Sequence, residues 1–169
     1  MSRNVPAATL RNLEKTSSPH ALIWFLTITH ENLAEPIRVV SDVFNYVLGG
    51  NTYVGLIFGV KVLTDNDQAP YSELRVQNVD RRIGLALREA RGRARVELRG
   101  YDTADFDLSQ DPRVEIATAP QVYGFSQFDL VDVEVNAMEI TGRVMLADYT
   151  QEPFPFIRAT AERTPGLFV

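Results

Sequence analysis

The two histidines and four of the serines are the side chains whose types could support catalysis. His20 and His30 flank one apolar segment, and ten residues of extended chain hold such a pair roughly 33 Å apart. They therefore cannot form one site within a subunit without a sharp bend. The serines considered as nucleophiles lack a Gly-x-Ser-x-Gly elbow: Ser17, Ser18, Ser41 and Ser126. Because no glycine-rich phosphate loop precedes a helical pattern either, we expect no catalytic residue and no cofactor.

The acidic segment from Asp102 to Asp111 is the best candidate for holding a cation. Four carboxylates in it could gather oxygen ligands for calcium: Asp102, Asp105, Asp107 and Asp111. Solvated acidic loops are far commoner than calcium sites, so no metal is expected. The sequence leaves open a pair of carboxylates that cleaves glycosides, although no motif marks a cleft. The absence of cysteine removes thiolate chemistry and the commonest structural zinc sites.

Composition limits the classes of protein to consider. A chain of 169 residues that is 45% hydrophobic is expected to form one domain with elaborated ends. The net charge of −5 argues against a general nucleic-acid binder. No apolar run approaches a membrane helix, and residues 1–6 lack the apolar stretch of a signal peptide, so we expect synthesis in the cytosol. Among the basic residues only Lys15 and Lys61 are lysines, and this excess of arginine fits either carboxylate pairing at interfaces or biased genomic base composition.

Hydrophobic periodicity predicts a mainly β protein. Residues 1–19 form an arm or a short helix, in which Leu10 and Leu13 have helical spacing. The next segment is apolar on both alternating faces and predicts a well-covered strand with Trp24 in the core. Further strands are predicted at residues 37–40, 46–48, 53–54, 56–63, 74–79, 93–99 and 130–140. Gly49 and Gly50 have the composition of a hairpin turn, and residues 80–91 are the best candidate for a helix.

Two strands carry opposite charge on their polar sides. On one strand, apolar residues predicted to face inward alternate with Arg93, Arg95 and Arg99. On the other, valines predicted to face inward alternate with Asp132 and Glu134. These Arg and acid faces could meet between neighbouring subunits, or they could be neighbouring strands of one subunit. The period-2 phase slips between residues 135 and 138, which indicates a β-bulge. The domain at residues 20–147 is therefore predicted to be a β-barrel or β-sandwich with one flanking helix.

Residues 148–169 are predicted to form an extended arm, because prolines among aromatic residues forbid helix and central strand. The arm is too apolar to stay in water, so we expect it to dock on a neighbouring subunit or on its own barrel. Its candidate interface residues are Phe154, Phe156, Leu167 and Phe168.

Three groups of motifs occur in this order: the segment Asn32 to Asp42, the segment Val76 to Arg81, and Tyr149 with Phe154-Pro155 and Thr164-Pro165-Gly166-Leu167. Together they resemble a family of phage tail proteins, most of which are described as a domain of unknown function. The resemblance covers about residues 20–169. It implies a relation to the distal tail proteins, which are β-barrels or β-sandwiches with a flanking helix that assemble as six-fold rings.

The resemblance implies a structural virion protein rather than an enzyme. Its partners would be further copies of itself, the tail tube protein, the tape-measure protein and the tail hub protein, without sequence-specific nucleic acid or membrane. The protein would reside in the virion at the tail tip. The alternatives are a tail-terminator or tail-completion ring and, from another class, a carbohydrate-binding or lysis-related enzyme domain.

Overall fold

The computed structural model describes residues 5–31, 33–60, 71–77, 93–136, 138–146, 162, 163 and 166. Its elements in chain order are α1 (Ala7–Glu14), β1 (Leu22–Thr29), β2 (Ile37–Val40), β3 (Tyr46–Leu48), β4 (Asn51–Gly55), β5 (Phe58–Val60), β6 (Tyr71–Gln77), β7 (Ala94–Asp102), the 3-10 helix η1 (Thr103–Asp105), β8 (Arg113–Val114), β9 (Tyr123–Val135) and β10 (Glu139–Leu146). The helix predicted at residues 80–91 and most of the arm at residues 148–169 lie outside the described residues.

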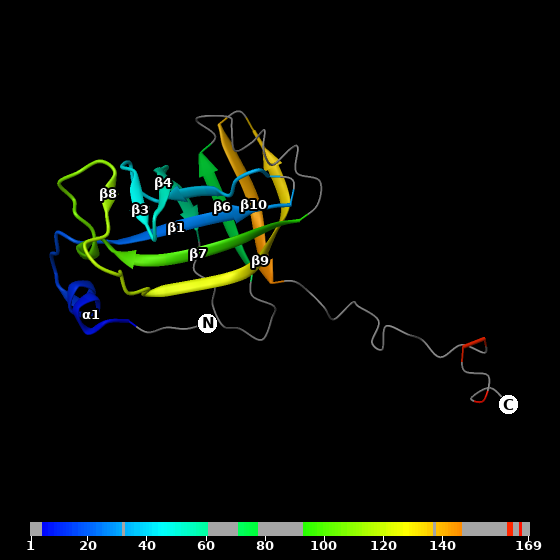
Figure 1. Cartoon of the computed structure of the whole chain (residues 1–169), viewed down its shortest axis with the longest axis horizontal. Coiled ribbons are helices and arrows are strands. Elements are labelled where there is room, and N and C mark those ends of the chain that lie inside the picture. The colour runs from blue at the N-terminus through cyan, green and yellow to red at the C-terminus, as the bar shows by residue number, and fades with distance from the viewer. Residues whose placement is uncertain are drawn as a thin grey trace.

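The strands form one curled sheet in the order β5-β6-β10-β9-β7-β1-β2-β4-β3-β8. Strands β1 and β7 run through its middle, and β6 and β10 curl behind them to make a half-barrel (Figure 1). Most neighbours are antiparallel, but β4 pairs in parallel with β2, and β8 pairs in parallel with β3. The prediction of a mainly β, barrel-like fold accompanied by a helix is confirmed.

The sheet has a hydrophobic core on each of its two faces. The inner core fills the half-barrel, and the outer core lies beneath β3, β4 and the segment after β7. Strand β1 contributes alternately to both: Leu26 and Ile28 point inward, whereas Ile23 and Phe25 point outward. This double coverage explains why β1 is apolar on both of its faces. Trp24 is partly buried against the inner core, edge to face with Tyr123 at 5.6 Å between ring centroids.

The strand and the turn predicted from the clearest local patterns are both present. In β7 the inward residues Ala94, Val96 and Leu98 are at most 5% exposed. Gly49 and Gly50 form the β3–β4 turn with φ angles of 55° and 76°, which only glycine adopts without strain.

The prediction of a single strand at residues 130–140 is wrong, because the ends of two strands meet there. Strand β9 ends at Val135 and β10 begins at Glu139, and the N–H of Asn136 donates to the carbonyl of Glu139 at 2.9 Å. Val133, predicted to face inward, is 37% exposed. A bulge does occur, but inside β9: Asp132 has a φ of 52°, and the register of β10 shifts beside it. Bulge and hairpin together produce the slip in phase, and the bulge bends the sheet.

Helix α1 lies within the predicted N-terminal segment but packs on an unexpected side. Thr9 is 3% exposed, whereas Leu10 and Leu13 are 48% and 52% exposed. The amide of Asn12 donates to Asp102 at 3.2 Å and fastens the helix to the end of β7. Within the part of the chain that the structure describes, no helix is long and apolar enough to cross a membrane.

Candidate functional site

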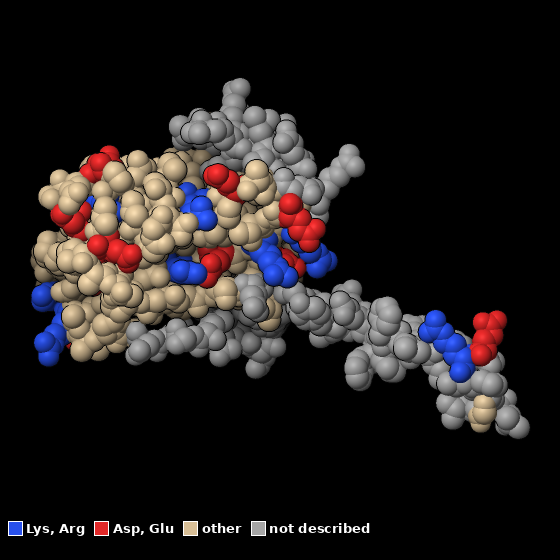
Figure 2. Space-filling view, in the orientation of Figure 1, with Lys and Arg blue, Asp and Glu red and all other residues tan. Residues whose placement is uncertain are grey.

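A polar groove of about 530 Å³ lies on the outer face of the sheet, beside the outer core. Its floor is formed by β1, β2 and β7, and its walls by the β3–β4 hairpin and the loop after β8. Its lining side chains are mainly polar: Thr27, Thr29, Arg38, Asn51, Tyr53, Glu97, Arg99, Tyr101, Glu115 and Thr118. The same face shows basic and acidic side chains gathered over the middle strands (Figure 2).

Strand pairing puts the floor of the groove in register. Thr27 of β1 lies opposite Arg38 of β2 on one side and opposite Glu97 of β7 on the other. Because neighbouring strands are about 4.8 Å apart, Arg38 and Glu97 are anchored about 10 Å from each other across Thr27. A hydroxyl group therefore separates a cation from a carboxylate.

Arg99 is held against Glu97 at one side of the floor. Its Nε and Nη2 donate to the same carboxylate oxygen, Oε1, at 2.9 and 2.7 Å. Burial lowers the pKa of the Arg99 guanidinium, but the hydrogen bond and charge of Glu97 outweigh burial, so that the pKa is raised above its usual value. The pair is a fixed planar surface with donors and an acceptor side by side.

Two tyrosines join the groove to the outer core. Tyr53 and Tyr101 are each 5% exposed, and their rings pack edge to face on Phe25 at 4.9 and 5.4 Å. The hydroxyl of Tyr53 lies 3.3 Å from the hydroxyl of Thr27. Burial raises the pKa of Tyr101, so its hydroxyl stays protonated and can donate. The tyrosines thus offer hydroxyl groups, while their ring faces are covered.

The wall of the groove is fixed by its own hydrogen bonds. The backbone N–H of Gly49 donates to Glu115 at 2.9 Å, and the amide of Asn51 donates to the Gly49 carbonyl at 3.3 Å. These contacts tie the β3–β4 turn to the loop after β8. The groove is therefore shaped before any ligand arrives.

A partly buried charge network fixes the strand that leads into this wall. Arg113 of β8 donates to Asp42 at 2.9 Å and to the Tyr46 hydroxyl at 2.7 Å, and its guanidinium lies 4.0 Å from the centre of the Phe44 ring. The Tyr46 hydroxyl donates to Asp42 at 2.6 Å. Burial, followed by this hydrogen bond, raises the pKa of Tyr46 to about 12. The network clamps β8 to the loop before β3.

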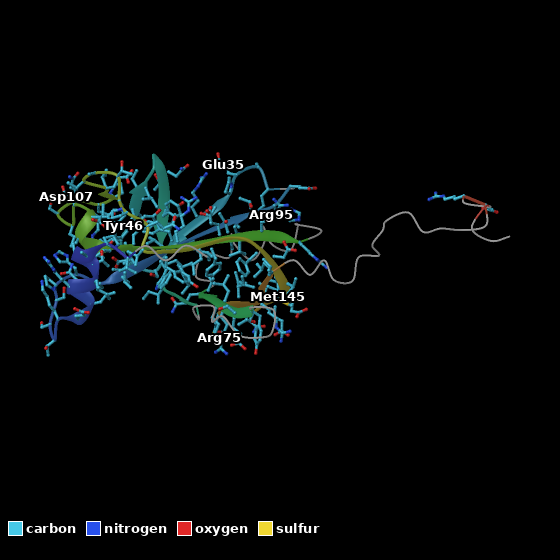
Figure 3. All side chains as sticks on the ribbon, turned by 90° about the horizontal axis from the view of Figure 1, so that it is seen from below. Glu35, Tyr46, Arg75, Arg95, Asp107 and Met145 are labelled. Carbon is cyan, nitrogen blue, oxygen red and sulfur yellow. The ribbon has the colours of Figure 1, made fainter. Side chains whose placement is uncertain are left out.

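The Arg face predicted on β7 occupies the same side of the sheet as the groove. Arg99 lines the groove, Arg95 lies further along β7, and Arg93 immediately precedes the strand. Arg95 lies on the opposite side of the molecule from Arg75 and Met145 (Figure 3). Arg93 forms an ion pair of 3.6 Å with Asp129 of the neighbouring strand β9.

The acid face is not brought together with the Arg face in this chain. Asp132 lies at the bulge, 3.9 Å from Arg143 of β10. Glu134 is exposed opposite Thr141 of the same strand. The remaining candidate interface residues, Phe154, Phe156, Leu167 and Phe168, lie outside the described residues.

Four exposed apolar side chains lie on β4 and on the segments next to it. Val43, Phe44, Val54 and Ile57, which we call the β4 patch, are between 41% and 67% exposed. The backbone of residues 43 and 44 lies so close to Gly55 that a Cβ there would be 2.6 Å from the Phe44 carbonyl oxygen. The loop before β3 therefore packs directly on the backbone of β4.

The acidic segment after β7 has structural roles. Asp102 accepts from the N–H of Ala104 at 3.0 Å, and Asp107 accepts from the N–H of Ser109 at 3.0 Å. Burial raises the pKa of Asp105. No three His, Asp or Glu side chains of the described residues gather as metal ligands.

Most residues of the groove were not predicted from the sequence. Arg38, Thr27, Glu97 and the two tyrosines were not singled out, although Thr27 and Thr29 interrupt an apolar strand on one face only. That interruption is the signal of a polar site on a covered strand.

Residues 8–159 match the family described as a domain of unknown function, DUF1833. The match covers most of the chain, which therefore belongs to this family. No curated protein matches the sequence.

Proposed function

We propose that the protein is a structural subunit of a long-tailed phage, which forms the distal tail ring that joins the tail tube to the hub. The observation that carries this proposal is the β4 patch on an open half-barrel. Apolar patches of this kind mark sites of protein association in soluble proteins. The order of the tail-protein motifs in the sequence supports the phage context, and no catalytic role is proposed.

A ring requires two different surfaces on each subunit that fit each other. The β4 patch supplies one of them, and the C-terminal arm, with its phenylalanines and prolines, supplies an apolar segment to cover it. Full burial of one such apolar side chain contributes about 1.5–3 kcal/mol. A six-fold ring with the tube, tape-measure and hub proteins as neighbours follows from the resemblance, as does a place at the virion tail tip after synthesis in the host cytoplasm.

The proposal is tested by the assembly state of the full chain. Sedimentation velocity and negative-stain images should show rings, and Val54→Asp should shift the protein to smaller species because a charge is costly in an apolar interface. Leu10→Asp is the matched control, since Leu10 is comparably exposed but lies on α1. A wild-type protein that stays monomeric at every concentration would refute ring formation.

A second assay separates the distal tail ring from a tail-terminator ring. Labelled protein added to purified tails should bind at the tip, and binding at the end that joins the head would favour the terminator.

A further inference from the structure

We propose that the outer-face groove binds a neutral saccharide. The binding residues are the paired row across three strands in which Thr27 separates Arg38 from the Glu97–Arg99 pair. This inference does not depend on ring formation. It assigns a ligand-binding site to the subunit in addition to its role in assembly.

The charges that line the groove balance one another. Arg38 and Arg99 are matched by Glu97 and Glu115. A ligand with a net charge would be repelled by the lining side chains that carry the same sign of charge. An uncharged ligand therefore suits the lining best. The volume of about 530 Å³ is within the range of small-molecule sites, roughly 300–1,000 Å³.

The groove offers both donors and acceptors that no described residue uses. Among the described residues the guanidinium of Arg38 has no hydrogen bond or ion pair. The two hydrogen bonds that Arg99 donates to Glu97 both reach Oε1, so among the described residues the second carboxylate oxygen is left to accept. Each hydroxyl of a sugar donates one hydrogen bond and accepts others, so neighbouring hydroxyls match a guanidinium beside a carboxylate.

The walls add apolar surface for the C–H groups of a sugar ring. Pro36, Leu48 and Ala119 line the groove together with the polar groups. The hydrogen bond from Gly49 to Glu115 holds the wall in place, so little ordering is needed on binding.

Two other classes of ligand fit less well. A peptide cannot add as a strand to the floor, because β1 is paired on both sides, with β2 and with β7. A nucleotide needs a surplus of cations for its phosphate and an exposed ring on which its base can stack. The lining charges balance, and Tyr53 and Tyr101 are each only 5% exposed.

Saturation-transfer NMR on the full chain tests the proposal with named probes. The neutral probes are glucose, galactose, N-acetylglucosamine and their trisaccharides, and the charged probes are glucuronic acid and glucosamine. We expect saturable binding of at least one neutral probe. Arg38→Ala and Glu97→Gln should each weaken it about tenfold, because each removes a charge-assisted hydrogen bond.

Arg75→Ala is the matched control, because Arg75 is exposed on β6 and on the opposite side from Arg95 (Figure 3). It should bind as the wild type does, and all variants should keep the wild-type melting temperature and sedimentation profile. Failure of every neutral probe would overturn the proposal, as would binding of charged probes only. Binding that survives both groove substitutions would overturn it as well.

Discussion

Replacing Phe25 by leucine should reveal how much the ring geometry of the outer core contributes to stability. Phe25 is 1% exposed and lies among four rings. It is edge to face with Tyr46, Tyr53 and Tyr101 at 5.7, 4.9 and 5.4 Å, and stacked on Phe106 at 5.6 Å. Leucine keeps the site filled by an apolar side chain but removes these four ring pairs.

The magnitude follows from the number of pairs. Each aromatic pair contributes about 0.5–1.5 kcal/mol beyond its buried area, so four pairs predict a loss of about 2–6 kcal/mol in the free energy of unfolding. Phe128→Leu is the matched control in the inner core, since Phe128 is 4% exposed and, among the described residues, contacts one ring, that of Phe125. That substitution should lose about 0.5–1.5 kcal/mol from its ring pair.

Urea unfolding, followed by far-UV circular dichroism, measures the two free energies. The near-UV spectrum should also lose tyrosine signal in Phe25→Leu, because three of its ring partners are tyrosines. Equal losses of stability in Phe25→Leu and Phe128→Leu would show that burial alone, and not the arrangement of the rings, stabilises the outer core.

Three further predictions concern the clamp around β8 and the loop before β3. Arg113→Ala should lower the free energy of unfolding by about 2–3 kcal/mol, because the mostly buried Asp42 carboxylate then lacks its cation. In urea titrations the double variant with Asp42→Ala should lose less stability than the sum of the losses in the two single variants. Gly55→Ala should lower the free energy of unfolding, measured by thermal unfolding, by about 1–3 kcal/mol, because the added Cβ meets backbone atoms. In the control Gly59→Ala the added Cβ meets open space, so the free energy of unfolding should change little. The raised pKa of Tyr46 favours the protonated phenol in the folded state, so its contribution to stability is present below pH 10 and is lost as the pH rises towards 12. Tyr46→Phe should flatten that part of the stability–pH curve, and an unchanged slope would contradict this origin.

Local patterns were sufficient where one strand or one turn decides the structure. The alternation of Ala94, Val96 and Leu98 with arginines predicts which side of β7 is buried, because the side chains of a strand point to opposite faces in turn. Gly49 and Gly50 predict the β3–β4 hairpin because both positions need a positive φ.

The β9–β10 hairpin was missed because its turn carries no strong signal. Residues 136–138 contain neither glycine nor proline, and valines continue up to the turn. A hairpin and a bulge each shift the phase of the period-2 pattern. The pattern alone therefore cannot show that both features are present here.

The groove was missed for a different reason, since it exists only after three strands pair. Thr27, Arg38 and Glu97 belong to separate strands, and nothing in the sequence around one of them identifies the other two as its neighbours. The Arg face was predicted on the correct strand, but the carboxylate that neutralises Arg99 is Glu97 of the same strand, not a residue of the acid face.

The central pairing of β1 with β7 has a consequence for synthesis. The two strands are about 70 residues apart in the chain, and ribosomes add about 5–20 residues per second, so β1 waits for several seconds before its partner is made. During that interval the segment Leu22–Leu26, apolar on both faces, is exposed to other nascent chains. The rate of synthesis and the supply of chaperones should therefore govern the soluble yield of this protein more than the final stability of its fold does.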